Sequence, residues 1–143
     1  MAEYSAVAIQ TIATDDNILF SNGSRCCKKG YVEHRDDSGV FFLKGITNQC
    51  RVIYKVSFGA NIAIATDGGT VEPISIALII NGEPLGNATA IVTPTAVGDY
   101  FNVFVSTFID VPYGCCVSVS VENTSATTDI DVQNANLIIE RVC

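Results

Sequence analysis

The stretch from Asp99 to Asn123 restricts the fold more than any other part of the sequence. Apolar residues alternate with mostly polar ones over 101–111, which is the period of a β-strand that buries one face. Pro112 and Gly114 interrupt the alternation, because proline cannot donate to a strand ladder and glycine permits a turn. A second alternating run follows over 115–121. The stretch therefore predicts two strands joined by a short turn, and it lacks the spacing of a helical stripe.

Runs of the same kind occur along the rest of the chain, and no segment has the pattern of an amphipathic helix. The predicted strands cover residues 6–12, 17–20, 31–34, 39–43, 50–64, 74–80, 87–92 and 130–142. Asn81-Gly82 is a strong tight-turn signal, and most of 21–38 is predicted to be a long polar loop. Short strands at this spacing predict an all-β sandwich or jelly roll. The length suits a single domain over 1–143, with 1–5 as a candidate N-terminal arm.

The composition indicates that other subunits cover part of the surface. Hydrophobic residues make up 48% of the chain and charged residues only 16%, against about 25% charged in typical domains. Phe104 and Phe108 lie out of phase with the core face of 101–111, so we expect them at a contact between subunits. Tyr54 joins them only if its strand is turned the other way.

Charge and hydropathy argue against two classes of partner. The net charge is −7, with a pI near 4.4, so we expect no binding to nucleic acid or to an anionic membrane surface. The longest apolar run, 76–80, is too short to cross a bilayer. Residues 1–10 lack the basic region and apolar core of a secretory signal, so we expect folding in a reducing cytosol.

The sequence does not indicate catalysis. His34, the sole histidine, lies in a polar segment and is expected to be exposed. A dyad of His34 with Cys26 or Cys27 is the less favoured alternative, because no third group to orient it is evident. We find no glycine-rich phosphate loop and no EF-hand spacing. We therefore expect no enzymatic activity, no catalytic residues, no cofactor and no metal site.

The six cysteines leave three interpretations open. Their two adjacent pairs do not fit the C-x-x-C spacing of structural zinc sites. Unpaired thiols, buried or in loops, are the favoured interpretation; a disulfide formed after release to an oxidising environment and a metal site are the other two. The cysteines are Cys26, Cys27, Cys50, Cys115, Cys116 and Cys143.

The order of the strands resembles the trimeric jelly-roll domains of the C1q and tumour-necrosis-factor-like superfamily. Three segments carry the resemblance, with looser support from 18–20 and 50–62: ISIALIINGEPL (74–85), VFVSTFIDVPYGCCVSVSVEN (103–123) and ANLIIERV (135–142). It is similar in particular to bacterial and phage members, such as the C-terminal domains of exosporium collagen-like proteins. Gly114 matches the family's Gly-Asp turn, whereas Cys115 stands where the aspartate is usual.

The resemblance implies a two-sheet jelly roll that assembles as a compact homotrimer, with Phe104 and Phe108 at the threefold contact. Because the chain shows neither a signal peptide nor a collagen-like stalk, we expect a phage virion protein made in the bacterial host cytoplasm. It would be a capsid decoration (cement) or head-fibre protein that binds the major capsid protein or other virion proteins at the capsid surface. The alternative is a receptor- or carbohydrate-binding module of a tail fibre or bacterial surface protein. Such a module would meet a host-surface glycan through loop tyrosines, for which Tyr31, Tyr100 and Tyr113 are the candidates.

The family's topology also implies where the cysteines meet. Its last strand lies antiparallel to the strand that begins at Cys50, which also neighbours the 101–111 strand. Cys143, Cys50 and the pair Cys115 and Cys116 are then expected at one end of the sandwich, with Cys50–Cys143 as the pairing if any disulfide forms. The early cysteines, Cys26 and Cys27, are expected toward the other end unless their loop folds back.

Overall fold

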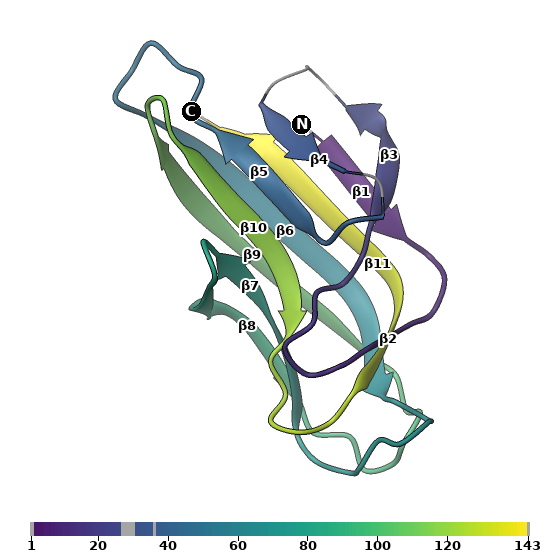
Figure 1. The fold of residues 1–143 in the computed structure, drawn as a ribbon. Helices are drawn as coiled ribbons and strands as arrows, with labels where there is room; N and C mark the ends of the chain where they lie inside the picture. Colours follow the sequence, from purple (N-terminus) through teal and green to yellow (C-terminus); the bar gives the residue numbers. More distant parts are fainter. Residues whose placement is uncertain (1, 27–30, 36, 143) are drawn as a thin grey trace.

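The chain folds into two stacked antiparallel β-sheets (Figure 1). The structure, a computed structural model, describes residues 2–26, 31–35 and 37–142, and only the backbone of 22–26. These residues contain no helix, and hence none that could span a membrane. The predicted all-β, two-sheet architecture is confirmed.

The first sheet has six strands, in the order β3-β1-β11-β6-β9, and β2 also pairs with β11. Its strands are β1 (Ala2–Ala6), β2 (Gln10–Ile12), β3 (Ser21–Cys26), β6 (Arg51–Ile64), β9 (Phe101–Pro112) and β11 (Ile130–Arg141). The candidate N-terminal arm was 1–5. Its described residues, 2–5, belong to β1, which lies inside this sheet between β3 and β11.

The second sheet has five strands, in the order β4-β5-β10-β7-β8. They are β4 (Val32–His34), β5 (Val40–Lys44), β7 (Ile74–Ile80), β8 (Glu83–Val92) and β10 (Cys116–Asn123). Asn81 and Gly82 form the predicted tight turn between β7 and β8, and both have positive φ.

The core lies between the sheets and is built from the residues that alternation assigns to one face. On β6, Val52, Val56 and Phe58 are fully buried. The rings of Phe20, Phe41 and Phe58 meet edge-on in its middle. Burying each large apolar side chain contributes roughly 1.5–3 kcal/mol, so this layer is the main source of stability.

The register of the first sheet confirms the predicted strand order. β6 runs antiparallel to both β11 and β9. Arg141 at the end of β11 lies opposite Tyr54 near the start of β6, and Arg51 at that start lies opposite Pro112 at the end of β9. Three segments that are distant in sequence therefore meet at one end of the sandwich.

Three predictions of local structure were wrong. The predicted strand 6–12 is divided into β1, which ends at Ala6, and β2, which begins at Gln10. The segment 21–26, predicted as loop, forms β3 along β1, because pairing with a neighbouring strand does not require apolar alternation. The predicted strand 17–20 is limited to isolated bridges, at Asn17 and at Phe20.

Candidate functional site

Strand β9 presents two phenylalanines on the outer side of the first sheet. Phe104 is 66% exposed and Phe108 64% exposed, whereas Val103, Val105 and Ile109 on the opposite side of the strand are buried. We call Phe104 and Phe108 the aromatic face. Two neighbouring aromatic rings in water on one strand are unfavourable unless something covers them.

The surroundings of the aromatic face leave room for a partner. Gly59 of β6 lies opposite Phe104, and a Cβ at that glycine would sit 3.7 Å from the Phe104 ring. Between the two phenylalanines, the hydroxyls of Ser57 and Ser106 bond to each other at 3.0 Å. Small side chains beside Phe104 therefore let an apposed surface approach closely, whereas Phe108 lies opposite the exposed Lys55.

β9 is also the last strand of its sheet, so one of its edges has no strand partner in the described part of the chain. Edge strands of this length are usually covered or charged, because their unpaired backbone groups invite association. At its end β9 carries one ion pair, between Arg51 and Asp110 at 3.0 Å. Lys55 lies opposite Phe108, but no ion pair between described residues crosses the aromatic face, which makes it the candidate contact between subunits.

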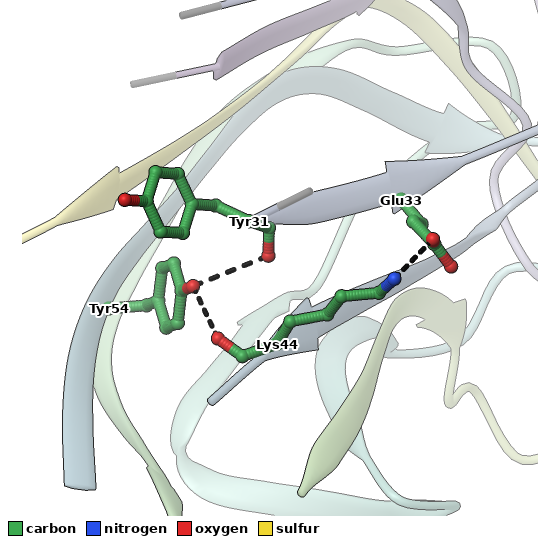
Figure 2. Close-up of polar contacts among 4 residues, drawn as sticks. All are labelled: Tyr31, Glu33, Lys44 and Tyr54. Carbon is green, nitrogen blue, oxygen red and sulfur yellow. Dashed lines mark hydrogen bonds and ion pairs between the residues drawn. The ribbon is translucent and has the colours of Figure 1, made fainter. Parts of the chain in front are cut away.

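Tyr54 does not belong to this face, so placing it there was wrong. It is 1% exposed, in phase with the other core residues of β6. Its hydroxyl donates to the Lys44 carbonyl oxygen at 2.7 Å and lies 3.3 Å from that of Tyr31, as Figure 2 shows. Burial raises the pKa of Tyr54. Tyr54 therefore links the two sheets from within.

The end where β6 starts carries exposed thiols. Cys50, Cys115 and Cys116 are exposed and free among the described residues. The Tyr113 amide donates to the Cys50 carbonyl oxygen at 3.0 Å, which places the turn after β9 beside the start of β6. Cys143 lies outside the described residues, so the pairing Cys50–Cys143 stays a prediction.

Cys26 follows the exception stated for the early cysteines, in which their segment folds back. The backbone of Cys26 lies opposite Ala2, which lies opposite Ile139 near the end of β11. Cys26 is therefore at the same end as Cys50 rather than the other one, because 21–26 runs back along β1 as a strand. Cys27 lies outside the described residues.

A hollow of about 610 Å³ opens at this same end. We call it the tyrosine hollow; its lining residues are Tyr31, Gly45, Ile46, Thr47, Asn48, Tyr113, Gly114 and Arg141. The guanidinium of Arg141 lies 4.7 Å from the centre of the Tyr31 ring, and its Nη1 donates to the Ile46 carbonyl oxygen at 2.8 Å. The volume is in the range of small-molecule sites, ~300–1,000 Å³.

The floor of the tyrosine hollow is held by backbone contacts. Gly45 donates to the Cys115 carbonyl oxygen at 2.9 Å and accepts from the Gly114 amide at 3.1 Å. A Cβ at Gly45 would lie 2.0 Å from the Pro112 carbonyl oxygen, so only glycine fits there. The loop after β5 and the turn after β9 are thus locked together, and Tyr113 stands on a rigid support.

Sequence reasoning named Tyr31 and Tyr113 as loop tyrosines but missed Arg141. The alternation of the last strand could have identified it, because Arg141 occupies the same side of β11 as the buried Leu137 and Ile139. A charged residue in that register at a strand end lies at the mouth of the core.

The histidine is a packing residue rather than an exposed one. The ring of His34 stacks on Phe41 with 4.2 Å between centroids and an interplanar angle of 12°. Its Nε2 lies 2.8 Å from the Ser38 carbonyl oxygen. The described residues hold no group of three or more histidine, cysteine or acidic side chains placed to bind a metal.

The sequence matches no family model and no curated protein. Solved structures share its fold. Murine APRIL at pH 5.0 aligns with a TM-score of 0.64 and 10% identity over 97% of this chain and 98% of that chain. The globular domain of zebrafish complement 1qA aligns with a TM-score of 0.53 and 11% identity over 96% of each chain. The chain therefore has the C1q/TNF-like jelly-roll fold, as predicted.

Proposed function

We propose that the chain is a homotrimeric, non-enzymatic structural module of a phage virion, either a capsid decoration protein or a head fibre. The observation that carries the proposal is the aromatic face, where Phe104 and Phe108 stand about two-thirds exposed on an edge strand. Contact with further copies of the chain removes these rings from water. Full burial of such a ring contributes roughly 1.5–3 kcal/mol, and a trimer has six of them.

A threefold ring suits the position of the aromatic face. It lies at one edge of the first sheet, and we expect the patch on one copy to meet a different surface on the next. Such head-to-tail contacts close into a ring when the rotation fits. The low charged content of the chain, 16%, supports the same assembly.

The virion role rests on the resemblance of the strands to phage members and on the acidic, aromatic-bearing surface. It is tested by deleting the coding sequence from the genome that carries it and purifying the particles. We expect them to lose resistance to heat and osmotic shock if the protein clamps the capsid, or to lose adsorption to cells if it displays an adhesive face. Particles that keep both properties would contradict the proposal.

A second candidate, a carbohydrate-binding module, is favoured by one specific observation. Two of the tyrosines expected in a sugar site, Tyr31 and Tyr113, line a single hollow together with Arg141. The third, Tyr100, directly precedes β9, whose first residue lies opposite Ile62 near the end of β6 and so at the other end of the sandwich. Binding of the trimer to a glycan array distinguishes an adhesive module from a purely structural one.

A further inference from the structure

The tyrosine hollow combines an exposed ring with fixed polar groups. Tyr113 is 66% exposed, and none of the described aromatic rings packs against it. Its backbone is held by the bond from its amide to Cys50 and by the locked turn at Gly45. Thr47 and Asn48 add hydroxyl and amide groups to the same lining. A rigid aromatic ring beside hydrogen-bonding groups suits a ligand with one apolar face and a polar rim, which describes a pyranose ring.

The charge in the hollow selects among such ligands. Its lining contains one cation, Arg141, and no acidic residue. None of the described carboxylates forms an ion pair with Arg141. One of its N–H groups donates to the Ile46 carbonyl oxygen, and the guanidinium also lies over the Tyr31 ring. The remaining donors are suited to a bidentate contact with a carboxylate.

We infer that the tyrosine hollow binds a carboxylated sugar, a hexuronate or sialate residue of a glycan, with its ring on Tyr113 and its carboxylate on Arg141. The inference deepens the carbohydrate-binding candidate above and rests on it. Three hollows on one trimer then give a multivalent glycan far tighter binding than one site.

Comparison with a second hollow shows why the tyrosine hollow is the better candidate for an acidic sugar. The second hollow lies beside β2 and has a volume of about 790 Å³, larger than the tyrosine hollow. Its lining contains no aromatic ring, and its single arginine, Arg35, shares it with Asp16 and Asp37. The second hollow is larger, but it offers neither an aromatic ring for stacking nor an excess of positive charge, so it is not suited to an acidic sugar.

The test is a titration of the full chain followed by amide NMR, with methyl glucuronide, methyl sialoside and the neutral methyl glucoside as probes. We expect at least one acidic sugar to shift the amides of 45–48, 113, 114 and 141, and the glucoside to bind about tenfold more weakly or less. Tyr113→Ala should weaken binding about tenfold, the scale of one lost stacking contact. Arg141→Gln should remove the preference for the acidic sugar.

Two matched controls separate the hollow from general surface effects. Tyr100→Ala removes an exposed tyrosine at the other end, and Arg51→Gln removes an exposed arginine outside the hollow. Both should bind like the unaltered chain. If Arg141→Gln fails to fold, the titration of the unaltered chain still decides.

The inference is overturned if neither acidic sugar shifts the amides of the hollow, if the glucoside binds equally well, or if Tyr113→Ala leaves binding unchanged. These failures are distinct from failure of the trimer. A monomeric chain that still binds the glucuronide supports the hollow and contradicts the trimer, whereas a trimer that binds no acidic sugar contradicts the hollow alone.

Discussion

The outer faces of the two sheets each expose phenylalanine, but in different settings. On the second sheet, Phe42 is 44% exposed and stands alone. It lies opposite Glu33, which forms an ion pair with Lys44 on the same face (Figure 2), and this contact raises the pKa of Lys44. On the first sheet, the aromatic face has two rings with Gly59 beside them and no ion pair between them. Charged side chains occur in both settings, since Phe108 lies opposite Lys55 and Asp110 follows it on the same strand. A single aromatic residue is ordinary protein surface, whereas a pair of exposed rings on an edge strand indicates a contact.

The largest expected effect comes from placing charge on the aromatic face. The double substitution Phe104→Asp with Phe108→Asp should dissociate the trimer, because burial of about 3–6 kcal/mol per chain is lost and carboxylates enter the contact. The monomer should stay folded, since both rings are already exposed in the single chain. Sedimentation velocity and circular dichroism measure the two properties. Phe42→Asp is the matched control and should leave the trimer intact. If this variant also dissociates, the distinction between the outer faces of the two sheets is contradicted.

A smaller effect, on stability rather than on assembly, is expected from a substitution of Tyr54, which lies in the core between the two sheets. Tyr54→Phe removes the hydroxyl that donates to Lys44 and so ties the first sheet to the second. The unfolding free energy should fall by about 1 kcal/mol, the usual contribution of one such bond, with assembly unchanged. Urea unfolding monitors this, and Tyr100→Phe on the surface should have no effect. Loss of the trimer in Tyr54→Phe would show that packing and assembly are not separable.

The smallest effect concerns charge on the second sheet. Burial raises the pKa of Glu122, and Asp15 and Asp16 raise it further. The folded chain therefore holds this proton more tightly than the unfolded chain, and stability is lost as the pH rises above the ordinary glutamate value of 4.5. Glu122→Gln should stabilise the protein at pH 7 by about 0.5 kcal/mol, and the gain should vanish below that value. Thermal melts at pH 4 and pH 7 test this, with the exposed Glu83→Gln as control.

The sequence was most informative where burial dictates the pattern. Alternation in β6 and β9 predicted which side of each strand faces the core, because successive side chains in a strand point to opposite faces. It also predicted that Phe104 and Phe108 would point outward. The conditional placement of Tyr54 outside failed, since its phase with Val52 and Val56 already assigned it to the core.

Features that depend on long-range contact were the ones missed. Strand β3 has no apolar alternation and forms by pairing with β1. The tyrosine hollow exists only because the loop after β5, the turn after β9 and the end of β11 meet at one end of the sandwich. Local sequence does not encode that meeting; the family topology predicted part of it, for the strand ends but not for Arg141.

The most direct test of the central claim is sedimentation equilibrium of the unaltered chain at micromolar concentration. The aromatic face predicts a single species with three times the 15.2 kDa mass of one chain, which should persist on dilution through the micromolar range. A stable 15.2 kDa monomer under the same conditions would contradict the account.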